Sequence, residues 1–242
     1  MITIRDNSGT RHVKAFVTDF TGAMGYCEFQ IPFFIEGVKV ETVQMAVGTE
    51  FHEQAEKMER ETAVVVPLTR TELEDKKSDL NFIREDIQTL FILEFESEHG
   101  KARLELFGRA DKVMRQKETL IISDDKHTYN PSRHDSMRKP YSSQLLQVLA
   151  YLHSRYYLGD SLGWSEIPHE RKAYQVNIID SKTGSVYKTY ENVVGKKEAE
   201  LLFGNALRFT QKCLQWDEMV HHNSRARCKA CGYFGDCSKA LR

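Results

Sequence analysis

The placement of the cysteines constrains this chain most strongly. Three of its five cysteines form a Cys-x2-Cys-x5-Cys run close to the C-terminus, at Cys228, Cys231 and Cys237, and Cys27 lies near the N-terminus. An odd number of cysteines, bunched in one tail of a chain without a secretory signal, argues against a disulfide framework and favours metal or cluster binding. Four thiolates bind either zinc or an iron–sulfur cluster, and both remain open, although Cys27 lacks the close partner that structural zinc sites usually have. Cys213 lies in the apolar run QKCLQW, which predicts a buried core thiol.

Charge and hydrophobicity exclude several classes of protein. Among 242 residues, 34 Lys and Arg stand against 35 Asp and Glu, so a polycationic binder is excluded, whereas a local basic groove is not. Hydrophobic residues make up 40% of the chain, enough for a full core in a single domain spanning residues 1–242. No apolar run approaches the roughly 20 residues of a membrane span, and no signal peptide is visible. We therefore expect a cytoplasmic protein that does not contact a membrane.

Periodicity along the chain predicts a mixed α/β domain built around a central sheet. The N-terminal segment reads as a short element around Cys27 followed by extended chain. Helical composition or spacing then marks four further segments: residues 48–62, 71–98, 139–158 and 196–220. Strand character marks residues 102–107, 111–115 and 119–123, and a hairpin is predicted from 173–179 and 186–190 around the turn DSKTGS.

Two carboxylates and a lysine come together in the most informative stretch. Asp111 follows one predicted strand and Asp124 follows the next, so adjacent strand ends would bring these two side chains close. Neighbouring carboxylates repel unless a cation lies between them, and oxygen ligands of this kind suit Mg²⁺ or Mn²⁺. Lys126 shares a strand face with Asp124, where its ammonium could stabilise charge on a phosphate. A charged strand end with a turn is the alternative interpretation of Asp124-Asp125-Lys126.

Two further motifs flank this stretch. His52 near the start of a predicted helix offers an imidazole as a third metal ligand. Gln147 and Tyr151 lie one helical turn apart and share a face beside an apolar stripe. Taken singly, His52 is better explained as a surface or satisfied histidine, and Gln147 or Tyr151 alone as part of an ordinary, partly buried helix.

In order, these pieces resemble the RecB-like branch of the PD-(D/E)xK nucleases. The family pattern is G-x3-H, G-x2-D, an apolar strand ending in D-x-K, and Q-x3-Y on a helix; here it is matched by Gly48 to His52, Gly108 to Asp111, Asp124 to Lys126 and Gln147 to Tyr151. The resemblance is greater to the iron–sulfur members, exonuclease V and its CRISPR-associated relatives, than to AddB-type nucleases. The resemblance extends from about Phe16 to Cys237 and includes the segments VTDFTGAMGYCEFQ and ELEDKKSDLNFIREDIQTL. Two departures are His127, where Ser or Thr is common, and Gln144, which competes with Gln147.

The resemblance implies a role for each matched residue in metal-assisted phosphodiester hydrolysis. His52, Asp111, Asp124 and the backbone carbonyl of Asp125 would hold Mg²⁺ or Mn²⁺. Lys126 would position the attacking water and stabilise the charge that develops on phosphorus. Gln147 and Tyr151 would orient Lys126 or a DNA phosphate.

The resemblance also implies a restriction-endonuclease-like fold, a central mixed sheet flanked by helices. An iron–sulfur subdomain would join the chain ends, with residues 1–47 and 221–242 around the cluster and residues 48–220 forming the nuclease core. The implied cofactor is a [4Fe–4S] cluster held by the four thiolates of Cys27, Cys228, Cys231 and Cys237.

A basic loop follows the proposed catalytic lysine directly. The stretch HTYNPSRHDSMRKPYSS carries Arg133, Arg138, Lys139 and Tyr141, and cations interleaved with aromatic residues suit a single-stranded phosphate backbone with unstacked bases. A solvated surface loop is the alternative interpretation.

These features together predict a metal-dependent DNA exonuclease that acts on single-stranded ends. Its setting would be DNA repair and recombination or CRISPR spacer acquisition. No G-x4-G-K-[ST] motif occurs, so a helicase partner would be a separate chain, as would a CRISPR integration complex. The rival hypothesis is a non-catalytic nucleic-acid-binding protein with a cysteine-ligated zinc site on a nuclease-like fold. A second alternative, a Holliday-junction or restriction endonuclease of the same superfamily, would cut closed circular DNA.

Overall fold

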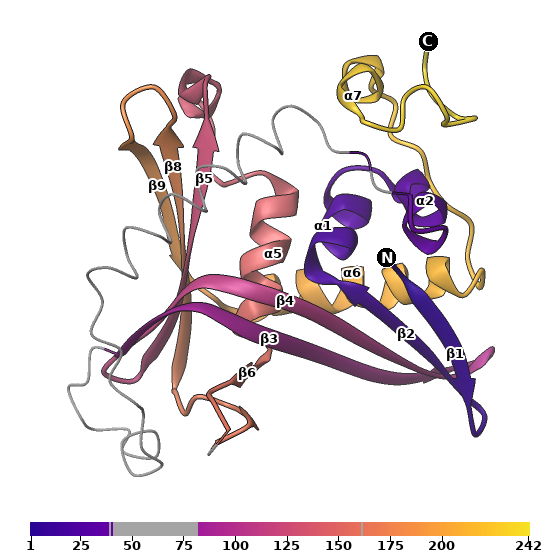
Figure 1. Cartoon of the computed structure of the whole chain (residues 1–242), viewed down its shortest axis with the longest axis horizontal. Helices are drawn as coiled ribbons and strands as arrows, with labels where there is room; N and C mark the ends of the chain where they lie inside the picture. Colours follow the sequence, from indigo (N-terminus) through magenta and orange to yellow (C-terminus); the bar gives the residue numbers. More distant parts are fainter. Residues whose placement is uncertain (39, 41–81, 161) are drawn as a thin grey trace.

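A mixed sheet organises the protein, as the computed structural model shows for residues 1–38, 40, 82–160 and 162–242 (Figure 1). Within these residues the sheet has nine strands. Seven of them follow the order β7-β6-β3-β4-β5-β8-β9; of the other two, β2 pairs with β4 and β1 pairs with β2. Its strands are β1 (Thr3–Asn7), β2 (Thr10–Phe16), β3 (Phe82–Ser97), β4 (Gly100–Gln116), β5 (Thr119–Thr128), β6 (Arg155–Tyr157), β7 (Trp164–Ser165), β8 (Arg171–Asp180) and β9 (Ser185–Val193). The β2–β4 and β5–β8 pairs are parallel and the other pairs are antiparallel. The prediction of a mixed α/β domain with a central sheet is therefore confirmed.

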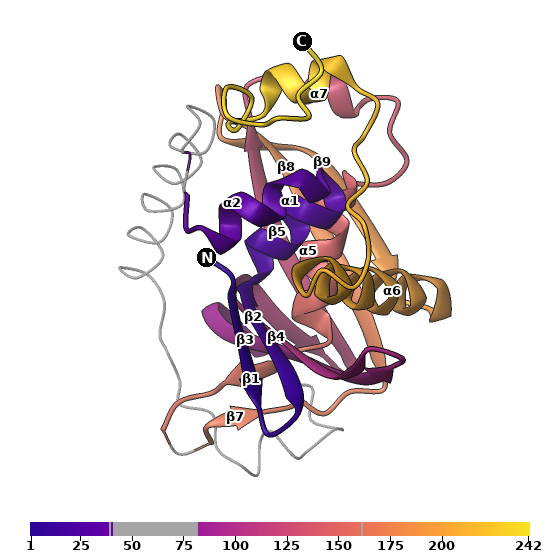
Figure 2. The same ribbon diagram turned by 90° about the vertical axis from the view of Figure 1, so that its right-hand side faces the viewer.

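Helices pack on this sheet and on one another. They are α1 (Val17–Gly25), α2 (Ile31–Ile35), α5 (Ser142–Leu152), α6 (Lys196–Cys213) and α7 (Arg225–Ala230), with short 3-10 helices η1 (Glu28–Gln30) and η2 (Pro131–His134). Figure 2 shows α1, α5 and α6 close together, with α7 above α1 at the top of the view. The close approach of α1 and α5 requires Gly25, since a Cβ there would lie 2.5 Å from the Ser143 backbone. No helix among the described residues is both long and apolar enough to cross a membrane.

The apolar stripe predicted on the helix after the basic loop is confirmed. Leu145, Val148, Leu149 and Leu152 are all buried in α5 and belong to the main core. The predicted hairpin around DSKTGS is also present as β8 and β9, where Gly184 takes a positive φ of 69° in the turn.

The prediction of a helix over residues 71–98 is wrong for its described part, because residues 82–97 form β3. Ile87, Thr89 and Phe91 are buried, whereas Gln88 is exposed, which is the two-residue period of a strand. Their sequence also fits a helical spacing, and pairing with β4 over nearly the whole strand decides between the two. Residues 48–62, and His52 with them, lie outside the described residues.

Three boundaries also differ from expectation. The strands expected at 102–107 and 111–115 are one continuous strand, β4, so Gly108 and Asp111 lie within a strand rather than at its end. The chain after Cys27 is helical at Ile31–Ile35 rather than extended, with Pro32 in the first turn and Ile31 buried. The last long helix ends at Cys213, not near residue 220, since Gln215 takes a positive φ of 58°.

The N-terminal strands belong to the central sheet. β2 pairs with β4 from Thr10 to Phe16, and Val13 and Ala15 are buried in the main core. The segment 1–47, which we assigned to a cluster region, thus also contributes two strands to the sheet of the expected core.

Candidate functional site

The sheet forks at the position of Asp111. On one side of β4, β2 pairs with residues 101–107 and β5 pairs with residues 112–116, while β3 runs along the other side. Figure 1 shows β2 and β5 diverging from β4, with α1 and α5 between them. Continuing the register of the Lys112–Ser123 pair places Asp111 opposite Asp124. The fork therefore turns two carboxyl groups toward the same space beneath α5.

Asp111, Asp124 and Lys126 meet in this space. The Nζ of Lys126 lies 3.0 Å from Oδ1 and 2.8 Å from Oδ2 of Asp124. The backbone N–H of Asp125 donates to Oδ2 of Asp111 at 3.3 Å. The side chain of Asp124 is fully buried, and that of Lys126 is 24% exposed, so the lysine lies on the side of the group that solvent reaches.

Burial and mutual charge shift the pKa values of all three groups. Burial, only partly offset by the charge of Lys126, raises the pKa of Asp111 and raises that of Asp124 to about 6. Burial alone would lower the pKa of Lys126, but the carboxylates of Asp124 and Asp111 outweigh it and raise that pKa. At neutral pH the ammonium is therefore protonated and acts as a donor and a positive charge, not as a base.

The donor set fits a divalent cation of the hard, oxygen-binding kind. Oδ2 of Asp124 is buried and lies 2.8 Å from the Lys126 ammonium, which is a single positive charge beside two carboxyl groups. Two neighbouring carboxylates with only one ammonium between them are an arrangement that Mg²⁺ or Mn²⁺ would favour. Asp111 and Asp124 would hold the ion.

The side chain of Asp125 is occupied elsewhere. Its Oδ1 accepts from Nδ2 of Asn177 at 2.8 Å, and its Oδ2 lies 3.9 Å from Nζ of Lys112. Asn177 is the direct strand neighbour of Asp125 on β8 and is itself held by Thr189 of β9. Only the backbone of Asp125 thus remains for the ligand role expected of it. Asn177, which the sequence did not single out, fixes this part of β5.

Gln147 and Tyr151 form a pair on α5, as their spacing predicts. Nε2 of Gln147 donates to the Tyr151 hydroxyl at 3.1 Å, and Tyr151 is buried. Burial raises the pKa of the Tyr151 hydroxyl far above its ordinary value, with Asp124 and Asp111 adding to the shift. The tyrosine is therefore a neutral hydroxyl beside the two carboxyl groups, and a role for this pair in orienting Lys126 or a phosphate stays a prediction.

Gly108 makes this arrangement possible. A Cβ at that position would lie 2.7 Å from Cε1 of Tyr151, closer than real Cβ contacts allow, and 3.0 Å from Cγ2 of Val17, tighter than most of them. The glycine of the G-x2-D motif has a packing reason here, because it admits the tyrosine ring against β4.

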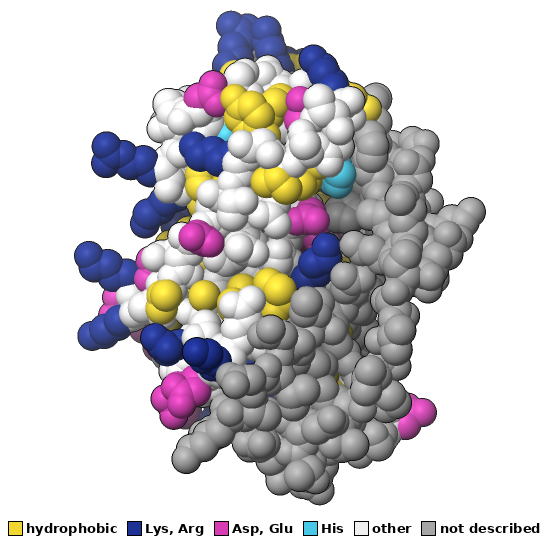
Figure 3. All heavy atoms as spheres, turned by 90° about the vertical axis from the view of Figure 1, so that its left-hand side faces the viewer, with side chains coloured by type: hydrophobic (Ala, Val, Ile, Leu, Met, Phe, Trp, Pro, Cys, Tyr) yellow, Lys and Arg dark blue, Asp and Glu magenta, His cyan; other side chains and the backbone are white. Residues whose placement is uncertain are grey.

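The basic loop is anchored to β9. Nζ of Lys188 donates to three of its carbonyl oxygens, those of His134, Asp135 and Met137, at 2.6, 3.3 and 2.8 Å. His134 is buried, and its Nδ1 lies 3.0 Å from the hydroxyl of Tyr190. The four residues predicted to bind DNA are all exposed: Arg133, Arg138, Lys139 and Tyr141. Figure 3 views the side of the molecule where β8 and β9 lie, and there Lys and Arg side chains project beside exposed apolar ones.

The chain ends bring the four predicted cluster cysteines into one pocket. Burial raises the pKa of the Cys27 thiol, and three neighbouring thiols raise it further: those of Cys228, Cys231 and Cys237. The Tyr26 hydroxyl donates to the Arg227 carbonyl at 2.6 Å, and Nε2 of Gln30 donates to Sγ of Cys231 at 3.5 Å. Cys213 is separate and buried in α6, as its apolar context predicts, and burial raises its pKa strongly.

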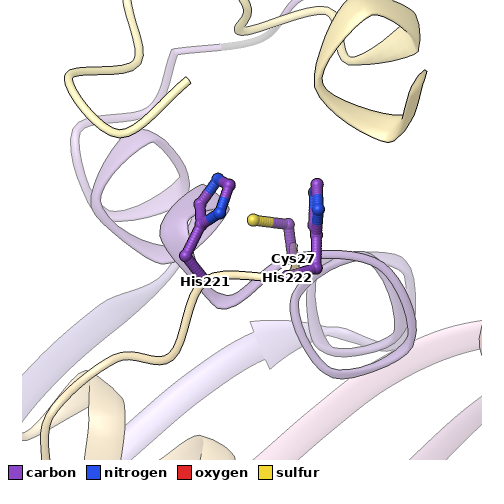
Figure 4. Close-up of side chains that lie close together, drawn as sticks. All are labelled: Cys27, His221 and His222. Atoms are coloured by element: carbon purple, nitrogen blue, oxygen red, sulfur yellow. The ribbon is translucent and has the colours of Figure 1, made fainter. Parts of the chain in front are cut away.

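Two histidines in this pocket were not anticipated. The ligand atoms of Cys27, His221 and His222 all lie within 4.8 Å of one another (Figure 4). The sequence did carry a signal, two adjacent histidines followed by five residues and Cys228. Histidine next to a cysteine run is a common source of metal ligands.

Comparison with known proteins shows a likeness in fold. No family model matches the chain, and no curated protein matches it by sequence. Among solved structures, the chain is similar to the crystal structure of SSO0001, with a TM-score of 0.51 and 15% sequence identity. The match covers 98% of this chain and 90% of that one. The likeness thus extends over the whole mixed α/β architecture.

Proposed function

We propose that the protein is a metal-dependent DNA exonuclease that hydrolyses phosphodiester bonds at single-stranded ends. The observation that carries the proposal is the group at the fork of the sheet, where the buried carboxyl group of Asp124 lies beside that of Asp111 and within 2.8 Å of the Lys126 ammonium. This set combines ligands for a hard cation with a fixed positive charge at a partly exposed position, which is what attack on a phosphate diester requires. The sequence resemblance makes DNA repair, recombination or CRISPR spacer acquisition the setting that we propose.

The side chains divide the work of hydrolysis between them. Asp111 and Asp124 would hold the divalent ion, which would neutralise charge on the scissile phosphate. Lys126 carries its proton throughout, so it donates hydrogen bonds to a phosphate oxygen or to the attacking water and stabilises the negative charge that builds up on phosphorus. Water forms the new O–P bond, the bond to the leaving sugar oxygen breaks, and solvent takes and returns the protons.

The anchored loop supports single-stranded DNA as the substrate. Arg133, Arg138 and Lys139 are exposed, and Tyr129 and Tyr141 are 52% and 44% exposed. Cations for the phosphates and free aromatic faces for unstacked bases are the two components of a single-strand binding surface. The loop follows directly on β5, which carries Asp124 and Lys126, so bound strands would lead toward the fork.

Cleavage of an end-labelled single-stranded oligonucleotide with Mg²⁺ or Mn²⁺ tests the proposal. The wild type should release short products, and Lys126→Ala should reduce the cleavage rate by roughly 100-fold or more, as loss of one electrostatic stabiliser typically does. Lys101→Ala is the matched control, because Lys101 is an exposed lysine elsewhere on the sheet, on β4. Wild-type rates in a well-folded Lys126→Ala protein would rule out this site.

A closed circular single strand separates the possible nuclease activities. An end-dependent enzyme leaves the circle intact, whereas an endonuclease of the same superfamily linearises it. Tight binding of the oligonucleotide without cleavage under either metal would favour the non-catalytic nucleic-acid-binding protein instead.

A further inference from the structure

The pocket between the chain ends holds two imidazoles in addition to its four thiols, and they form a second possible set of metal ligands together with Cys27. The thiol of Cys27 and the imidazoles of His221 and His222 come within 4.8 Å of one another (Figure 4). Cys27 is buried and both histidines are half-buried, so the three groups converge at the edge of the interior rather than in open solvent.

A fourth group, the thiol of Cys228, adjoins His221 at a distance that fits a shared ion. Sγ of Cys228 lies 3.6 Å from Nε2 of His221. In a tetrahedral zinc site with Zn–S near 2.3 Å and Zn–N near 2.1 Å, a sulfur and a nitrogen are separated by about 3.6 Å. The cysteine and the histidine therefore already have the separation of two ligands on one zinc ion.

Contacts outside the pocket hold both ligand segments in place. Glu28 follows Cys27 directly, and its Oε2 accepts the backbone N–H of Val220, next to His221, at 2.6 Å. Oε1 of Glu28 is paired with Nη2 of Arg208 at 2.6 Å, and Glu28 is buried. Because the carboxylate of Glu28 joins the two segments, the cysteine and the histidines face each other without needing an ion to bring them together.

We propose that this pocket binds a single Zn²⁺ through Cys27, Cys228, His221 and His222 when no cluster is assembled in it. This ligand set shares two cysteines with the four-thiolate set and leaves out Cys231 and Cys237. The pocket could thus hold either a cluster on four thiolates or a zinc ion on two thiolates and two imidazoles. This inference does not depend on the proposed nuclease function, because Asp111, Asp124 and Lys126 take no part in it.

Metal titration of the full-length apo protein under anaerobic, reducing conditions tests the proposal, with Co²⁺ as the coloured probe and Zn²⁺ as its competitor. The wild type should bind one Co²⁺ with a tetrahedral visible spectrum. The double variant His221→Ala/His222→Ala should bind it roughly 100-fold or more weakly, since even second-shell changes cost up to that much. The double variant Cys231→Ser/Cys237→Ser should retain the wild-type affinity. His99→Ala and Cys213→Ser are the matched controls and should also bind as the wild type does.

The opposite pattern would overturn the proposal. Unchanged Co²⁺ binding after loss of both histidines, with binding abolished in Cys231→Ser/Cys237→Ser, would show a four-thiolate site. X-ray absorption of the zinc-loaded wild type needs no variant and should show two nitrogen and two sulfur ligands; four sulfurs would exclude the histidines. Reconstitution with iron and sulfide should still colour the double-histidine variant, and a failure there would contradict two separate ligand sets.

Discussion

Asp124 is a fully buried carboxyl group with a second carboxyl group and an ammonium group as neighbours. Burial raises its pKa to about 6, whereas an unfolded aspartate titrates near 4. Between these values the folded protein binds more protons than the unfolded chain does. Stability of the metal-free protein must therefore fall as the pH rises through this window. A further cation beside these carboxyl groups would oppose this loss of stability, as the proposed metal site requires.

We expect the Asp124→Asn protein to lose most of this pH dependence. Without metal, the wild type should become less stable from about pH 4 to about pH 6, by about 3 kcal/mol, because each unit by which the Asp124 pKa is raised corresponds to roughly 1.4 kcal/mol. Urea unfolding across this range measures it. At pH 7, Mg²⁺ or Mn²⁺ should stabilise the wild type and have little effect on Asp124→Asn. A pH dependence equal in both proteins would show that Asp124 is not the titrating group.

Gly108 is the second position where a single residue decides the site. Gly108→Ala should destabilise the protein by about 1–3 kcal/mol, because its Cβ would lie 2.7 Å from the Tyr151 ring. Gly204→Ala is the matched control on α6, since a Cβ there meets nothing within 4 Å. That change should stabilise the protein by up to about 1 kcal/mol through helix propensity. Thermal unfolding of both variants tests whether the first change lowers stability and the second raises it. Equal effects of the two changes would contradict the packing argument.

At the scale of elements, β4 and the basic loop position the residues of the proposed site. β4 exchanges one strand partner for another at Asp111, and this exchange opens the space for the two carboxyl groups. The loop after β5 keeps its shape because Lys188 of β9 binds three of its carbonyl groups. Its cations can therefore face a ligand without first being ordered, which favours binding.

Removing the loop cations should weaken single-stranded DNA binding and its salt dependence together. The triple variant Arg133→Ala/Arg138→Ala/Lys139→Ala should lower the slope of log Kd against log salt by about 2, because each phosphate contact to a single strand contributes roughly 0.7. A triple alanine variant of Arg5, Lys196 and Lys197, exposed cations on β1 and α6, controls for net charge. Fluorescence anisotropy at several salt concentrations measures the Kd and the salt slope of both triple variants. An unchanged slope would make this loop an ordinary solvated surface.

At the scale of the whole molecule, the two chain ends close on each other. Glu28 links η1 to Arg208 and Lys212 of α6 through ion pairs of 2.6 and 3.7 Å. Tyr233 near the C-terminus stacks on Phe33 of α2, with ring centroids 4.5 Å apart. The cysteine pocket lies within these contacts, so a metal centre there would tie together segments about 200 residues apart in sequence.

The cysteines should therefore separate into two classes by their effect on the whole fold. Cys27→Ser should lose the metal centre and lower the melting temperature, because binding energy available only in the folded state is folding energy. Cys213→Ser should retain the metal centre and lower stability no more than a modest core substitution does, since the Cys213 thiol is buried in α6 away from the pocket. Iron content, colour and thermal stability of anaerobically purified variants check this. Colour lost in Cys213→Ser but kept in Cys27→Ser would reverse the assignment.

The sequence by itself determined the elements whose pattern is local. The apolar stripe of α5 and the β8–β9 hairpin follow from side-chain period and turn residues, which neighbouring residues alone impose. The spacing of Asp124 and Lys126 likewise put both on one strand face.

Tertiary structure decided the rest. Residues 82–97 became a strand because β4 pairs with them along their length, and Asp111 met Asp124 because β4 changes partners there. His221 and His222 reached Cys27 because a buried carboxylate, Glu28, binds the segment beside them. Contacts of this kind depend on which distant segments pack together, and that information is not contained in any local period.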